Sequence, residues 1–90
     1  MSNTLHIGFD FYIMVSEIES ILPTTSQKMM KNIYELNENG EMLIYDCTKN
    51  KSRKSFIMTK GNNCYISAIS TGILTKRLER QKSKGDFNEE

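Results

Sequence analysis

A chain of 90 residues, 38% of them hydrophobic, makes one small domain that can bury a single modest core. It holds no run of about 18 apolar residues and no N-terminal secretory pattern, so we expect a cytoplasmic protein without a membrane partner. The net charge of +1 hides a strong sorting: residues 1–46 carry two bases and seven acids (−5), residues 47–84 ten bases and one acid (+9), and the last six residues −3.

The first predicted elements are two short strands at residues 5–8 and 11–15, which are rich in β-favouring side chains. The stretch Gly8-Phe9-Asp10 between them is a candidate tight turn. Residues 16–22 are ambiguous, because their apolar spacing fits a helical face while their short length fits a strand.

A helix is predicted to follow residues 24–26 and to run to about Asn39. The three hydroxyl residues at 24–26 are candidate N-caps, and Gly40 is suited to the left-handed position that follows a helix. One apolar stripe at helical spacing supports this helix: Met29, Met30, Ile33 and Leu36.

Three strands are predicted in the second half of the chain, at residues 41–48, 55–59 and 64–70. Residues 60–63 (KGNN) form a hairpin turn between the last two strands. Residues 49–54 (KNKSRK) form a polar hairpin loop between the first two.

Ser70 or Thr71 can cap a short last helix that follows. Residues 81–90 are polar, lack periodicity and are expected to form a disordered tail beyond a single domain of residues 1–80. The predicted fold class is α+β: a small, mostly antiparallel sheet of about five strands, with one main helix and a short C-terminal helix.

The principal candidate site is the loop of residues 49–54. Alternation along an extended loop points all its bases but one in the same direction, with Lys54 opposed. A basic loop held between strands can reach a phosphate backbone, and nucleic acid is the partner that fits the +9 stretch best. A solvated turn, or a charged face that only keeps the protein soluble, is the alternative. The bases of this loop are Lys49, Lys51, Arg53 and Lys54.

The predicted last helix carries a second group of cations. Helical spacing puts Lys76, Arg77 and Arg80 on one side. We expect Lys76 and Arg77 to make auxiliary phosphate contacts, and Arg80 to pair with the helix C-terminus.

The residue inventory predicts no enzyme. His6 has no partner nearby in the sequence and is expected to be a hydrogen-bonded structural residue. No nucleophile and base can be paired, so no catalytic residue and no small-molecule substrate are expected. Cys47 and Cys64 are expected to be reduced thiols that pack as small apolar side chains. With one histidine and no Cys-x-x-Cys pair, the chain predicts no metal and no cofactor.

Several short segments occur in an order that is typical of one known family. Over roughly residues 4–78 the chain resembles the bacterial extracellular-matrix regulators of the Rem family, and the RemB branch more closely than the RemA branch. The segments are LHIGFDF (5–11), EIESIL (17–22), the helix ending near Gly40, MLIYDCT (42–48), KSFIMT (54–59), CYISAIS (64–70) and LTKRL (74–78).

This resemblance implies a cytoplasmic transcriptional regulator without enzymatic activity. Family members of the RemA type bind DNA upstream of biofilm-matrix genes and assemble into ring-shaped homo-oligomers. They carry adjacent arginines in the loop where this chain has Lys51 and Ser52, followed by Arg53 and Lys54. Phosphate contact survives such a difference better than bidentate reading of a base.

The sequence therefore predicts a non-catalytic regulator that binds duplex DNA through its basic loop as a ring-like homo-oligomer. The alternative is a protein-interaction or structural oligomer without DNA affinity, in which the acidic half of one copy docks on the basic half of the next. RNA is a third option, and it is disfavoured because the tyrosines are better explained by packing.

Overall fold

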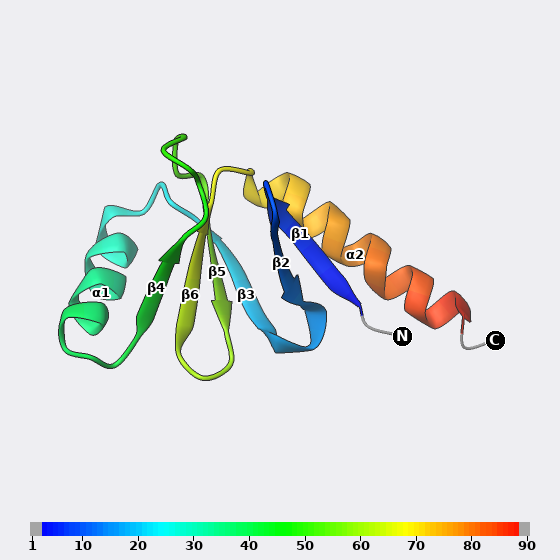
Figure 1. The fold of residues 1–90 in the computed structure, drawn as a ribbon, viewed down its shortest axis with the longest axis horizontal. Coiled ribbons are helices and arrows are strands. Elements are labelled where there is room, and N and C mark those ends of the chain that lie inside the picture. The colour runs from blue at the N-terminus through cyan, green and yellow to red at the C-terminus, as the bar shows by residue number, and fades with distance from the viewer. Residues whose placement is uncertain (1–2, 89–90) are drawn as a thin grey trace.

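The computed structural model describes the backbone of residues 3–88 and the side chains of residues 3–81. Its fold is α+β, as predicted (Figure 1). The elements in chain order are β1 (Thr4–Gly8), β2 (Phe11–Met14), the 3₁₀ helix η1 (Val15–Glu17), β3 (Ile18–Pro23), α1 (Gln27–Glu38), β4 (Leu43–Asp46), β5 (Ser55–Thr59), β6 (Asn63–Ser67) and α2 (Thr71–Asn88).

The strands form two sheets instead of the single sheet of about five strands that was expected. One is the antiparallel pair β1-β2, and the other has the order β3-β5-β6-β4. Within the larger sheet β4 runs parallel to β6, while the remaining neighbours are antiparallel. The neighbouring pairs β1-β2 and β5-β6 were predicted correctly from their turns. The pairing of β4 with β6 and of β3 with β5 was not predicted, because side-chain patterns in strands this short do not encode which distant strand lies alongside.

The ambiguous segment at residues 16–22 is a strand after the short η1 turn. β3 pairs with β5 along its whole length, with a register shift between Ile18 and Ser20. Pairing with β5 makes this segment a strand and not a helix, because the neighbouring strand supplies the backbone hydrogen bonds that a helix would have formed locally.

The ends of α1 lie where local signals placed them. The Ser26 hydroxyl accepts a hydrogen bond from the Met29 amide at 3.2 Å, which identifies the N-cap among the three candidates. Gly40 takes the left-handed conformation with φ of +77° just beyond the helix. Ile33 is the buried residue of the helix, and it packs against the larger sheet.

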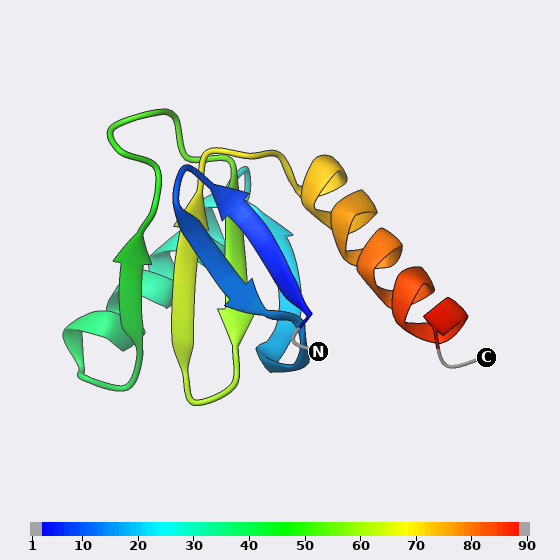
Figure 2. The same ribbon diagram turned by 45° about the vertical axis from the view of Figure 1, so that its right-hand side comes forward.

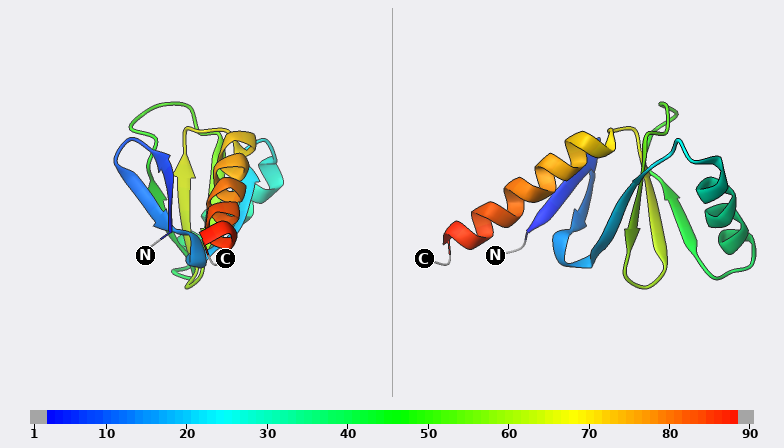
Figure 3. Two further views of the ribbon diagram at one scale, coloured as in Figure 1. Left: turned by 90° about the vertical axis from the view of Figure 1, so that its right-hand side faces the viewer. Right: turned by 180° about the vertical axis from the view of Figure 1, so that it is seen from behind.

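Two apolar clusters, instead of one, lie on opposite faces of the larger sheet. Neighbouring residues of β5 point to opposite faces, so Phe56 belongs to one cluster and Ile57 to the other. The Phe56 face is covered by α1, and the Ile57 face by β1, β2 and the start of α2 (Figures 1 and 3). The sheet is therefore the middle layer of a small three-layer domain.

Helix α2 is longer than the short last helix that was expected. It runs from Thr71 to Asn88, through a stretch rich in Glu, Arg, Gln and Lys, which are good helix formers even without an apolar face. Residues 81–88 of the tail that was expected at 81–90 are therefore part of α2, and the domain boundary at residue 80 stays a prediction.

Candidate nucleic-acid interface

The basic loop, residues 49–54, lies in the connection from β4 to β5 and projects beyond one end of the larger sheet (Figures 1 and 2). It is not the hairpin loop that was expected, because β6 lies between β4 and β5. The connection crosses the end of β6 and is held there on both sides. The Cys47 amide donates to the Ile66 carbonyl at 2.9 Å, and the Lys54 amide donates to the Ser67 carbonyl at 2.9 Å.

A tight turn shapes the first half of the loop. Lys49 and Asn50 have positive φ angles of 49° and 70°, and the Lys51 amide donates to the Thr48 carbonyl at 3.0 Å. The predicted alternation of the loop side chains is therefore wrong, because two left-handed residues fold the chain back on itself instead of extending it.

The Asp46 carboxylate stabilises the start of this turn. It accepts hydrogen bonds from the Thr48 hydroxyl at 2.6 Å and from the Thr48 amide at 2.9 Å. These two bonds, and then the nearby charge of Arg53, hold the pKa of Asp46 below its usual value. The base of the loop is thus ordered before any partner arrives.

The first lysine of the loop leans toward the β1–β2 turn. The Nζ of Lys49 lies 5.2 Å from the centroid of the Phe9 ring, a cation–π contact across two exposed side chains. Lys51 and Lys54 are exposed, and together with Ser52 and Ala68 they line a shallow hollow of about 270 Å³.

Arg53 leans the other way, toward α1. Its guanidinium donates to the Tyr34 hydroxyl at 2.6 Å and lies 5.9 Å from the centroid of the same ring. The Thr24 hydroxyl donates to the Arg53 carbonyl at 3.0 Å and holds the backbone. The loop therefore spreads its cations across one end of the domain, from the β1–β2 turn to α1.

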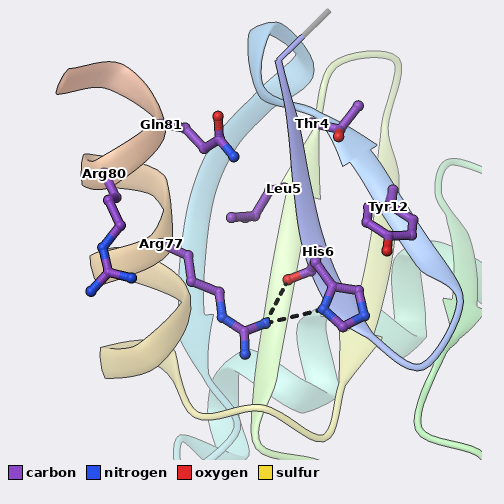
Figure 4. Close-up of a pocket in the computed structure, with 7 residues that line it drawn as sticks. All are labelled: Thr4, Leu5, His6, Tyr12, Arg77, Arg80 and Gln81. Atoms are coloured by element: carbon purple, nitrogen blue, oxygen red, sulfur yellow. Dashed lines mark hydrogen bonds between the residues drawn. The ribbon is translucent and has the colours of Figure 1, made fainter. Parts of the chain in front are cut away.

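The α2 cations lie apart from the loop. Helix α2 starts beside the same end of the sheet and then runs away from it (Figures 1 and 3). Lys76 is exposed, whereas Arg77 is half-buried and donates to the His6 carbonyl at 3.0 Å, with His6 Nδ1 at 3.4 Å (Figure 4). Arg77 thus fastens α2 to β1 in addition to carrying charge.

Sequence reasoning missed the residues that position the cations. Phe9 lies 40 positions from Lys49 in the sequence, and Tyr34 lies 19 positions from Arg53. No local sequence pattern predicts contacts between residues so far apart. His6 was correctly predicted as a hydrogen-bonded structural residue: its Nε2 lies 2.6 Å from the Phe9 carbonyl.

Both cysteines are free thiols buried in the two clusters, as expected. Burial raises the pKa of Cys47, and it raises the pKa of Cys64 to about 12. Among the described residues, no group of three or more His, Cys, Asp or Glu side chains is placed to hold a metal ion. Within the described part of the chain, no helix has the length and apolar character needed to cross a bilayer.

Known protein families show what the chain is similar to. A family model described as extracellular matrix regulatory protein A-like, or RemA-like, matches residues 4–78, which include the whole basic loop. The chain belongs to this RemA-like family. The resemblance to the Rem family is thereby confirmed, and the assignment to its RemB branch stays a prediction.

Individual relatives agree with the family. A protein of Coprothermobacter proteolyticus named "putative regulatory protein" is 32% identical over 80 residues, covering 89% of this chain and 74% of the relative. Proteins of the same name are 25% identical in Nitratidesulfovibrio vulgaris, covering 86% of this chain and 87% of the relative, and 24% identical in Maridesulfovibrio salexigens, covering 91% and 93%. All three relatives are called regulatory by name.

Proposed function

We propose that this RemA-like protein is a non-catalytic regulator that binds duplex DNA as a homo-oligomer through the basic loop. Lys49, Lys51, Arg53 and Lys54 are the primary contacts, and Lys76 and Arg77 add positive charge from α2. One observation carries the proposal: four exposed cations stand at one end of the domain on a connection that is hydrogen-bonded at both ends to β6.

The loop chemistry favours contact with phosphates. Lysines supply movable point charges, and Arg53 supplies a planar fork that can bind a phosphate through two N–H groups. Because Tyr34 occupies the NH1 nitrogen of Arg53, the remaining donors of the guanidinium face a partner in a restricted orientation. Binding through phosphates places the protein on the duplex and gives little sequence information by itself.

Several copies acting together compensate for the few contacts of one loop. Linked copies that contact the same duplex gain avidity without any new type of contact. An exposed apolar side chain on an outer strand supports self-association: Leu43 is 57% exposed on β4, an edge strand of the larger sheet.

The test is a salt titration of duplex DNA binding by fluorescence anisotropy, with the double variant Lys51→Ala/Arg53→Ala. Each neutralised phosphate contributes about 0.9 to the slope of log K against log salt concentration. The wild type should bind with a steep negative slope. The double variant should bind more weakly, with a slope shallower by about 0.9 for each phosphate that its loop no longer neutralises.

The matched control is Lys31→Ala/Lys60→Ala. It removes the same charge from exposed sites on α1 and on the β5–β6 hairpin, which lies at the opposite end of the sheet (Figure 1). It should retain most of the wild-type slope. Equal slopes for the two double variants would show that net charge, and not the basic loop, governs binding.

A second candidate function is a protein-interaction oligomer without DNA affinity. The exposed apolar residues of β2 and β4 favour it, because they fit a protein surface and do not require nucleic acid. The titration separates the two functions: a protein that assembles but shows no salt-dependent affinity for duplex DNA is the interaction module.

A further inference from the structure

A hollow of about 320 Å³ lies between β1 and α2, and no residue of the basic loop lines it (Figure 4). Strand β1 forms its floor, α2 forms one wall, and Tyr12 of β2 forms the other. The polar and aromatic side chains that line it are Thr4, His6, Tyr12, Arg77, Arg80 and Gln81.

The charged side chains that line the hollow are positive. Arg77 and Arg80, less than one helical turn apart on α2, are the formally charged side chains of the lining, and no carboxylate stands among the described residues that form it. Such a hollow attracts anions, and guanidinium groups bind phosphates or carboxylates through paired N–H donors.

Arg77 is held in position in advance. One nitrogen, NH1, makes both of its contacts with His6, to the carbonyl and to Nδ1. A guanidinium carries five N–H donors on three nitrogens, so most of its donors stay available while the group is fixed. A fixed donor loses less side-chain entropy when it binds an anion than a free one does.

The proton on His6 can be assigned from its two partners. Nε2 lies 2.6 Å from the Phe9 carbonyl, which only accepts, so Nε2 carries the hydrogen. Nδ1 is then the acceptor for Arg77. Both ring nitrogens are therefore used, and the imidazole is locked in one orientation.

The locked imidazole supports an aromatic surface. The rings of His6 and Tyr12 have centroids 4.9 Å apart and planes tilted by 34°. Tyr12 is 62% exposed, so much of its ring is accessible to a planar group. Aromatic side chains stack nucleobases of any sequence.

We propose that this hollow binds a nucleoside monophosphate, with the phosphate on Arg77 and Arg80 and the base stacked on Tyr12. Thr4 and Gln81 supply a hydroxyl and an amide for the sugar or the base edge. The volume of about 320 Å³ is at the small end of the roughly 300–1,000 Å³ typical of ligand pockets. The site does not depend on the proposed function.

The test is isothermal titration calorimetry of the full chain with adenosine 5′-monophosphate, adenosine and inorganic phosphate. The nucleotide should bind at least about tenfold more tightly than either fragment, because only it engages both the arginines and the ring. Tyr12→Ser and Arg80→Gln should each weaken nucleotide binding by about tenfold. Both residues are exposed, so neither change should alter the thermal midpoint by more than a few degrees.

Lys60→Gln is the matched control for charge, since it removes one cation from a distant hairpin. It should change nucleotide affinity by less than about twofold, because exposed charges farther apart than a Debye length of about 8 Å are screened. The loop variant Lys51→Ala/Arg53→Ala separates this site from the proposed function: it should lose DNA affinity and retain nucleotide affinity.

Three results would overturn the proposal. The first is no heat of binding for the nucleotide at millimolar concentration with the folded protein. The second is equal affinity for inorganic phosphate and the nucleotide, since Tyr12 then contributes nothing. The third is loss of nucleotide binding in the loop variant, which would place the bound nucleotide at the basic loop.

Discussion

At the scale of single residues, one buried hydroxyl connects the two sheets. Ser67 of β6 is fully buried, and its hydroxyl donates to the Ile7 carbonyl of β1 at 2.7 Å. The same oxygen accepts from the Ile69 amide at 2.9 Å, where the chain turns toward α2. Within residues 3–81 no buried side-chain nitrogen or oxygen lacks a partner, so this polar contact is part of a satisfied interior.

Ser67→Ala should lower the free energy of unfolding by about 1–3 kcal/mol, because it leaves a buried carbonyl and a partly buried amide without their shared partner. Urea unfolding followed by circular dichroism measures this. The exposed Ser52→Ala is the control and should stay within about 0.5 kcal/mol of wild type. An unchanged urea midpoint for Ser67→Ala would mean that water replaces the hydroxyl.

At the scale of elements, the connection between β4 and β5 is ordered by its own first residues. Asp46 ends β4 and accepts two hydrogen bonds from Thr48, and the turn that follows uses two left-handed residues. The basic loop therefore starts from a fixed point and not from a flexible strand end. Its ordering reduces the entropy that a phosphate contact has to overcome.

Two substitutions of Asp46 separate turn order from charge. Asp46→Asn and Asp46→Ala both remove a negative charge beside Arg53, but only the asparagine retains an oxygen that can accept from Thr48. Under the proposed function, Asp46→Asn should bind duplex DNA at least as tightly as wild type. Asp46→Ala should bind about fivefold more weakly than Asp46→Asn, which corresponds to a decrease of about 1 kcal/mol in the stability of the turn.

Fluorescence anisotropy at a fixed salt concentration measures the ratio of the two affinities. Equal affinities for the two variants would show that the Thr48 contacts do not order the loop for binding.

At the scale of the whole molecule, the three layers separate the basic end from the apolar edges. The basic loop stands beyond one end of the larger sheet, and β4 forms one lateral edge of that sheet. Strand β2 belongs to the smaller sheet, which covers the face opposite α1 (Figure 1). Contacts between copies through the edges would leave the loops of all copies exposed. This arrangement is compatible with binding one duplex by several subunits at once.

Light scattering should give a mass that is a multiple of 10.4 kDa, and this mass should persist at about 1 M salt. Burial of apolar side chains is not screened by salt, whereas contacts between acidic and basic surfaces are. Leu43→Lys should reduce the mass, because it places a charge on the exposed edge of β4. Leu36→Lys, on an exposed position of α1, is the matched control and should not.

A monomer mass at all concentrations would contradict self-association. Dissociation at high salt would instead support the electrostatic head-to-tail assembly that the charge sorting first suggested.

Local signals predicted much of the fold. The hydroxyl before α1, the glycine after it and the KGNN turn between β5 and β6 each act on neighbouring residues, so their effects can be derived from short stretches. The basic loop was found for the same reason, since its four cations lie within six residues. What surrounds the cations of the loop and of α2 was not predictable, because Tyr34, Phe9 and His6 reach them from remote parts of the chain.

The sequence by itself determined the α+β class, the cationic loop and membership of the RemA-like family, because propensity, charge and motif order are properties of neighbouring residues. Only the tertiary structure decided that β4 pairs with β6, that the loop crosses a strand instead of closing a hairpin, and that Arg77 meets His6 beside a hollow. The physical reason is that strand pairing, and a contact between residues 71 positions apart in the sequence, depend on how whole layers pack. The packing of layers depends on the sum of many weak contacts, which no short stretch of sequence contains.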